Sequence, residues 1–352
     1  FVPAVWPALP GQAPPVVDFV SSFGAGGYEV ATDTSGTTKA LKWISPLIGV
    51  SADQAVLRIS DFVYVSGGFS FNKGAGAKVD VQTNLTEAQA LAVFGASTIT
   101  PSETDPLDGS LSWTSNGSMI WNLPVETLDF GLSNVDVFFG YADGLEALVA
   151  DGDLSPADLD ATNAIGVTLD ETDLALVHMR ALPGTGVPTL DSALLQFFAL
   201  QGNADFIGLV GIPELQVEGV GIEVRLNQGS FTPGAWTTLP GQAPPVVDFT
   251  QSFPDDSMSG TPGDADSDAD GYRVMTGTNS FIPILFDTPL IAAGAENLTI
   301  RVSEFMHLTG SFFFEQGPTI NPTLAPGLLS DPTEIASAIG VDIDAGFLGT
   351  GM

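Results

Sequence analysis

Apolar and polar residues alternate with a period of two along many short segments of this chain, which is the pattern of half-buried β-strands. In one such segment, the positions on one face are Val63, Val65, Gly67, Phe69 and Phe71. The same alternation, or a short apolar run, predicts further strands at residues 135–139, 167–169, 174–179, 206–211 and 215–226. Between these runs stand 40 glycines and 25 prolines, as expected where turns join strands.

Helical signals are few and short. Thr86 and Gln89 form a capping-box pattern, which predicts a helix that ends at Gly95. Further helix starts are predicted at Ser155, Asp191 and Asp331. Because so few helices are available to connect parallel strands, we expect an all-β fold. Its predicted form is an elongated array of tandem β-rich repeats, solenoid-like or built as tandem sandwiches, with a few short helices.

One segment of the chain occurs twice without change. Residues 9–19 have the sequence LPGQAPPVVDF, and residues 239–249 repeat every letter of it. Repetition of this length indicates that one structural unit was copied. The chain is therefore predicted to hold a complete β-rich repeat unit at residues 1–235 and a second, partial copy of the same unit at residues 236–352.

The similarity of the two copies continues beyond the identical segment. Their offset rises from 249 − 19 = 230 to 272 − 28 = 244 at Tyr28 and Tyr272, so copy two carries an insertion of about 14 residues. Residues 300–317 then match residues 57–74 in their apolar and polar positions. Copy two stops about half-way through the unit, and we therefore expect the chain to be part of a longer polypeptide.

Charge excludes one class of partner. The 42 carboxylates against nine lysines and arginines give a formal net charge of −33, while 44% of the residues are hydrophobic. A chain of this composition folds, but it cannot assemble the basic patch that nucleic acid or an anionic membrane requires. High salt or divalent cations must screen the carboxylates, and an extracellular, saline medium supplies both.

Cysteine usage and hydropathy add two limits. The chain has no cysteine, which rules out disulfides and thiol catalysis and is compatible with a secreted protein that calcium stabilises. No run of about 18 apolar residues occurs, so no membrane span is predicted within this sequence.

The insertion in copy two is the first candidate metal site. Its alternate carboxylates precede Gly271, as in loops that wrap oxygen ligands around Ca²⁺. The twelfth position of such a loop is Gly277 and not the usual glutamate, so a complete EF-hand is not expected. A solvated acidic loop is the alternative reading. The predicted calcium ligands are Asp264, Asp266, Asp268, Asp270 and the backbone carbonyl of Tyr272.

A second candidate loop lies in copy one. Asp151, Asp153 and Asp158 resemble the second half of a dockerin-like calcium loop, with an acid six residues after Gly152. The first half fails, because two positions that should be acidic are Ala147 and Val149. The alternative is a turn in which Ser155 caps a helix.

Catalytic signals are missing from the sequence. It has no GxSxG, phosphate-binding loop or HExxH motif, and its only histidines are His178 and His307. Among 42 acids, some pair always has a spacing that suits a glycosidase, so no pair can be singled out. We therefore expect a non-enzymatic protein.

Aromatic residues recur at alternate strand positions in both copies. Phe69 and Phe71 in copy one match Phe312 and Phe314 in copy two. Packing in the core or between units is the expected use of this stripe, rather than ligand stacking.

Several segments resemble the repeats of giant secreted bacterial surface proteins, which stack many such units beside calcium-binding adhesin modules. The segments that carry the resemblance are residues 57–60, 65–73, 198–211 and 217–227. The resemblance covers most of both copies through degenerate motifs. It implies a surface or matrix role and offers no catalytic residues.

These observations predict an extracellular or cell-surface structural or adhesive repeat protein, stabilised by calcium and part of a bacterial surface layer, filament or adhesin. The expected partners are further copies of the same unit, by self-association or within one chain, and a cell-surface or carbohydrate ligand. The alternatives are a secreted calcium-dependent hydrolase and a carbohydrate-binding module on a β-scaffold. Salt adaptation is the other explanation of the acidity.

Overall fold

The computed structural model of the chain describes residues 16–43, 47–60, 62–74, 76–95, 97, 99–145, 154, 158–159, 163–232, 236, 242–254 and 271–317. Antiparallel β-structure dominates these residues, and the helices among them are short. The helices are α1 (Phe19–Phe23), α2 (Glu87–Phe94), α5 (Pro188–Ala193) and α6 (Phe249–Ser252). The expectation of a mostly β fold with a few short helices is confirmed.

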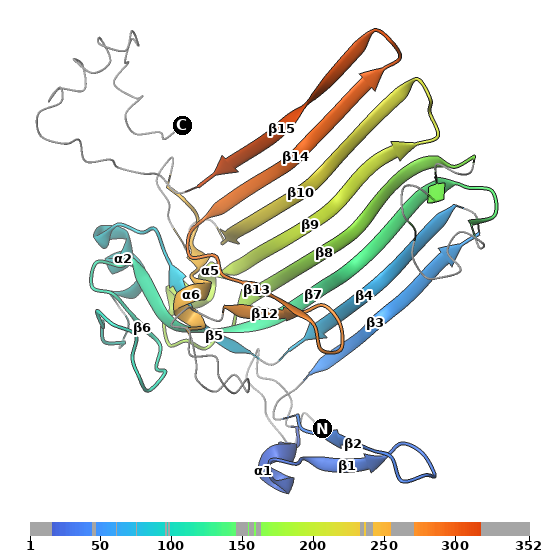
Figure 1. Cartoon of the computed structure of the whole chain (residues 1–352). Coiled ribbons are helices and arrows are strands. Elements are labelled where there is room, and N and C mark those ends of the chain that lie inside the picture. The colour runs from blue at the N-terminus through green and yellow to red at the C-terminus, as the bar shows by residue number, and fades with distance from the viewer. Residues whose placement is uncertain are drawn as a thin grey trace, which may run out of the picture.

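Eight long strands form one broad antiparallel sheet (Figure 1). Their spatial order is β3-β4-β7-β8-β9-β10-β14-β15, so most neighbours in space are also neighbours along the chain. Their bounds are Ile48–Ile59 (β3), Val63–Lys73 (β4), Met119–Tyr141 (β7), Ile165–Ala181 (β8), Gln196–Val210 (β9), Leu215–Ser230 (β10), Leu290–Val302 (β14) and Met306–Gln316 (β15).

Shorter strands complete the fold. Two of them pair with β7 in the main sheet, β5 (Ala77–Gln82) and β6 (Ser112–Trp113), and a third, β11 (Val246–Val247), pairs with β5. Four others form two separate hairpins: β1 (Tyr28–Ala31) with β2 (Thr38–Leu41), and β12 (Tyr272–Met275) with β13 (Phe281–Ile284). The β1–β2 hairpin stands apart from the sheet, whereas β12–β13 lies across it (Figure 1).

Buried apolar side chains form two clusters. The larger cluster lies at the end of the sheet that α2, α5 and α6 cover (Figure 1), and it includes Ile120, Phe197, Trp236 and Phe249. The smaller cluster contains Tyr64 and Phe138. The end of the sheet that carries the larger cluster is therefore where most of the apolar stabilisation arises.

The two edge hairpins of the main sheet have the same register. Ala55 pairs with Gly67 in β3–β4, and Leu298 pairs with Gly310 in β14–β15; both offsets are 243 residues, since 298 − 55 and 310 − 67 each equal 243. The register shifts immediately before Ala55 in one hairpin and immediately before Leu298 in the other. Matching sequence thus forms matching hairpins at opposite edges of one sheet.

Of the four helix predictions, one is confirmed, one helix begins at another residue, and two lie outside the described residues. The capping box is confirmed, because the Gln89 side chain accepts the Thr86 N–H at 2.8 Å and the Thr86 hydroxyl accepts the Gln89 N–H. The helix predicted to start at Asp191 begins instead at Pro188, whose fixed φ suits a first helical position. The starts predicted at Ser155 and Asp331 lie outside the described residues.

The aromatic stripe is more exposed than a core position would be. On β4 the fully buried face carries Tyr64, Ser66 and Ser70, while Phe69 and Phe71 lie on the other, partly exposed face. Phe312 and Phe314 on β15 are about half exposed. The core reading of this stripe is therefore wrong for copy two, and packing between units stays a prediction.

One sheet contains strands from both predicted copies. β14, from the range 236–352, pairs along its length with β10, from the range 1–235. The boundary between residues 235 and 236 and the tandem organisation stay predictions. What the described residues establish is a continuous ladder of strands that passes from one range into the other.

Candidate functional site

A segment of the range 236–352 packs on strands of the range 1–235. We call it the docking segment: the described residues 242–254 and 271–288, which contain β11, α6, β12 and β13. α6 contacts β5, and the β12–β13 hairpin contacts β7, β8 and β9 (Figure 1). Its most buried apolar side chains are Val246, Val247, Phe249, Val274 and Ile284. The docking segment thus completes the larger core.

Small residues on β4 and β7 let the docking segment approach closely. A side chain at Gly131 would collide with the backbone carbonyl oxygen of Met275. The Ser133 hydroxyl donates to the carbonyl oxygen of Thr276 at 3.3 Å. Glycine and serine therefore replace larger strand residues on this face because another backbone lies against it.

Asp129 is a buried carboxylate beneath the docking segment. The Tyr272 hydroxyl donates to its two oxygens at 2.9 and 3.1 Å. Burial raises the pKa of Asp129 to about 6, although the hydrogen bond from Tyr272 acts in the opposite direction. Burial, with the nearby Asp129 charge, also raises the pKa of Tyr272 far above its usual value, so the phenol remains a donor.

Asp80 on β5 is the second buried carboxylate at this contact. It accepts the Asn122 N–H at 2.9 Å, and its backbone carbonyl accepts the Asp248 N–H at 2.9 Å. Burial, followed by the charges of Asp105 and Asp248, raises the pKa of Asp80 to about 6, against the lowering effect of the Asn122 hydrogen bond. Shifted carboxylates often mark catalytic sites. Here both Asp80 and Asp129 are at least nine-tenths buried under a packed segment, which suits a structural contact.

The Tyr272 contact gives a matched pair of tests. Tyr272→Phe removes the only side-chain hydroxyl bonded to Asp129 within the described residues, and we expect it to lower the free energy of unfolding by about 1–3 kcal/mol at pH 8. Tyr28→Phe, at the equivalent and half-exposed position, is expected to change it by less than about 0.5 kcal/mol. Urea denaturation of both variants measures the difference. Equal effects would contradict a buried contact at Tyr272.

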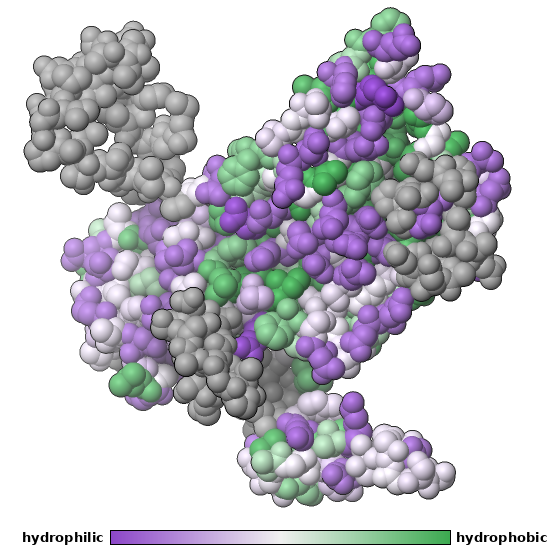
Figure 2. Space-filling view, viewed as in Figure 1, coloured by the Kyte–Doolittle hydropathy of each residue, from purple (hydrophilic) through white to green (hydrophobic). Residues whose placement is uncertain are grey.

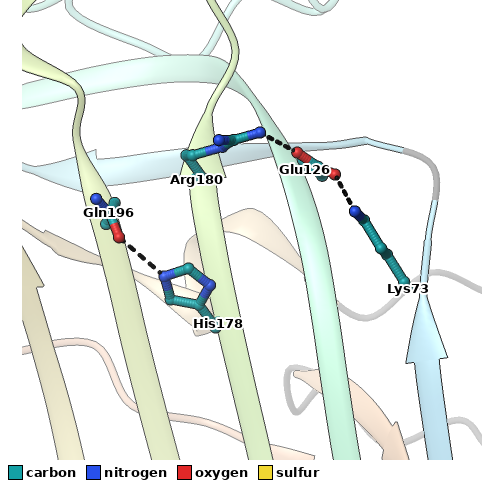
Figure 3. A network of polar contacts seen from close by, with 5 residues as sticks. All are labelled: Lys73, Glu126, His178, Arg180 and Gln196. Carbon is teal, nitrogen blue, oxygen red and sulfur yellow. Dashed lines mark hydrogen bonds and ion pairs between the residues drawn. The ribbon is translucent and has the colours of Figure 1, made fainter. Parts of the chain in front are cut away.

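A polar network on β4, β7, β8 and β9 is the second candidate site (Figure 3). Glu126 accepts from Arg180 at 2.6 Å and lies 3.3 Å from the Lys73 ammonium group. His178 Nε2 lies 3.2 Å from the side-chain oxygen of Gln196. Arg180 first, and then Lys73, lowers the pKa of Glu126, so this carboxylate stays ionised.

This network is suited to joining strands. Lys73 and Arg180 are more than half exposed, so each ion pair contributes at most about 1 kcal/mol. Glu126 is held as an anion between two cations and is a poor general acid. The network could not be predicted from the sequence, because its members meet only through strand register: Glu126 pairs directly with Arg180 across β7 and β8.

The predicted calcium ligands fall mostly outside the described residues. Among them, Tyr272 begins β12 and directs its hydroxyl to Asp129, and Asp158 lies in a short helical turn. Within the part of the chain that the structure describes, no cluster of three acidic, histidine or cysteine side chains has a metal-binding arrangement. The residues that lie outside the described ranges are Asp151, Asp153, Asp264, Asp266, Asp268 and Asp270.

Comparison with known proteins yields no relative. No protein-family model, curated protein or solved structure is significantly similar to this chain. None of the helices in the described ranges is long and apolar enough to cross a membrane.

Proposed function

We propose that this chain is a non-enzymatic, extracellular structural or adhesive protein of a bacterial surface layer, filament or adhesin. In this proposal it is built from tandem β-rich units that extend one sheet from unit to unit, and calcium stabilises its acidic loops. Repetition then supplies length, or multiplies a weak contact into avidity.

The pairing of β14 with β10 carries the proposal. β14 and β15 repeat the sequence pattern, register and register shift of β3 and β4. β14 continues the ladder of copy one, and the docking segment that precedes it fills the core of copy one. A unit that completes its neighbour in this way is suited to building a long object.

Exposed strand edges support self-association. Within the described residues, β3 pairs only with β4 and β15 pairs only with β14, so each presents one unpaired side. Large apolar side chains are half or more exposed on both strands, among them Val56 and Ile59 on β3 and Leu308 and Phe313 on β15. Such edges favour the addition of strands from other molecules.

Electron microscopy and light scattering of the concentrated full chain test this function. We expect particles that lengthen with concentration, because heterologous edge contacts build open chains. A protein that remains a dispersed monomer up to millimolar concentration, and that hydrolyses a polysaccharide, would instead be the calcium-dependent hydrolase.

The calcium part of the proposal has its own test. At low ionic strength, saturating Ca²⁺ is expected to raise the melting temperature by several degrees over the chelated protein, since a ligand at 100 times its Kd stabilises by about 2.7 kcal/mol. The variant Asp266→Asn/Asp268→Asn is expected to lose most of this increase. If chelation leaves the melting temperature unchanged while NaCl raises it, salt adaptation explains the net charge of −33.

A further inference from the structure

The N-terminal segment, residues 16–43, has the same local structure as the docking segment. Asp18 caps α1 by accepting the Ser21 N–H, and Asp248 caps α6 by accepting the Gln251 N–H. The Phe19 N–H bonds the Trp43 carbonyl at 2.9 Å, and the Phe249 N–H bonds the Phe286 carbonyl at 2.8 Å. The β1–β2 and β12–β13 hairpins also have matching register.

The two segments differ in burial. Val246 and Val247 are both 0% exposed, whereas Val16 and Val17, in the same PPVVDF sequence, are 50% and 53% exposed. Val274 is 0% exposed and its equivalent, Val30, is 40% exposed. The N-terminal segment stands away from the sheet with apolar residues on its visible surface (Figure 2). One folded module is thus seen twice, once packed and once without the surface that packs it.

Strand β3 differs from its equivalent, β14, in the number of strands paired with it. β14 pairs with β15 on one side and with β10 on the other, while β3 pairs only with β4 within the described residues. Ile48, Val50 and Ile59 on β3 are more than half exposed. Among the described residues, neither the N-terminal segment nor β3 is packed as its equivalent is.

We infer that the N-terminal segment together with β3 is a docking surface for residues 63–230 of a second copy of the repeat unit. This inference rests on the proposed function and names the contact through which units join. In this chain β14 and the docking segment already occupy the corresponding surfaces, so the second copy is one in which these surfaces are free. Its β10 edge then pairs with β3, and its β5, β7 and β8 cover the N-terminal segment.

The contacts of the docking segment and of β14 indicate which residues would meet in this interface. Within the chain, Val217 pairs with Ile300 and Leu226 pairs with Ile291. The β3 residues equivalent to these β14 partners are Leu57 (300 − 243 = 57) and Ile48 (291 − 243 = 48). Val217 and Leu226 of the second copy would therefore pair with Leu57 and Ile48. Val17 takes the place of Val247 beside β5, and Tyr28 takes the place of Tyr272 above the second copy's Asp129. Apolar side chains and one phenol–carboxylate bond thus form the recognition chemistry.

Hydrogen exchange of the full chain with a synthetic peptide of residues 215–230 tests this surface. The peptide presents the β10 strand alone, and the full chain offers β3. We expect saturable binding that slows the outward-facing amides of β3 about tenfold or more at saturation, as 90% occupancy requires. Amides of β15 are expected to keep their rates.

A peptide with Val220→Pro and Val224→Pro is the matched control, because proline removes the N–H groups that a ladder needs. Unchanged exchange in β3, equal slowing in β3 and β15, or equal binding of the proline peptide would each overturn the inference. If the peptide does not protect β3 although the full chain assembles in electron microscopy, this surface is rejected and the proposed function is kept. If the peptide protects β3 but the full chain assembles at no concentration, the surface is kept and the proposed function is rejected.

Discussion

Val247→Asp is expected to lower the free energy of unfolding by roughly 3–5 kcal/mol, which is the cost of a buried charge without a partner. Val247 is fully buried between β5 and the larger core, and its backbone pairs with Val81. An aspartate there must either lose its charge or force β11 away from β5. We expect β11, and α6 which follows it directly, to separate from the sheet first, because the ladder between β11 and β5 is only two residue pairs long.

Val17→Asp is the matched control. The substitution and the flanking sequence are the same, but Val17 is 53% exposed, so we expect a change below about 0.5 kcal/mol. Denaturant unfolding of the wild type and both variants gives the comparison. Equal losses would mean that the two segments have equal environments, which would contradict the packing of the docking segment.

Stability is expected to fall as the pH rises from about 4 to 7. The pKa values of Asp80 and Asp129 are raised to about 6 in the folded protein from 3.8. In this window the unfolded chain has released both protons while the folded protein still holds them, so rising pH favours unfolding. The contribution is full below pH 3.8 and is lost through pH 6, and it amounts to roughly 2–3 kcal/mol for each group.

Asp80→Asn separates this effect from the general repulsion among 42 carboxylates. The asparagine oxygen can still accept the Asn122 N–H, but the side chain no longer titrates, so the dependence on pH should be flatter. Asp205→Asn removes the same charge from an exposed position on β9 and should keep the slope of the wild type. If both variants have the slope of the wild type, burial of Asp80 is not the cause.

The alternation of residues was enough to predict the fold class, but it did not predict the lengths of the strands. The segment predicted as a strand at residues 135–139 is only the end of β7, which begins at Met119. Pro124, Asn122 and Asn134 are residue types that disfavour a continuous strand, and both asparagines have positive φ. β7 continues through them because it is paired on both sides, so tertiary pairing outweighs local preference.

The repeat was visible in the sequence, whereas the contact between copies was not. The two valines of identical PPVVDF segments are buried at residues 246–247 and about half exposed at residues 16–17, and no local pattern distinguishes them. Asp129 and Tyr272 are 143 residues apart and meet only because β12 crosses β7. Burial of this kind depends on which unit precedes a segment, and single-sequence periodicity holds no information on that.

Hydrogen exchange of β14 compared with β3 in the isolated full chain tests the central claim most directly, because the two strands share register and sequence pattern within one molecule. If the sheet continues from copy one into copy two, the amides of β14 are protected on both sides by β10 and β15. They should then exchange about tenfold or more slowly than those of β3, half of which face away from β4. Equal rates at equivalent positions of β14 and β3 would contradict the account.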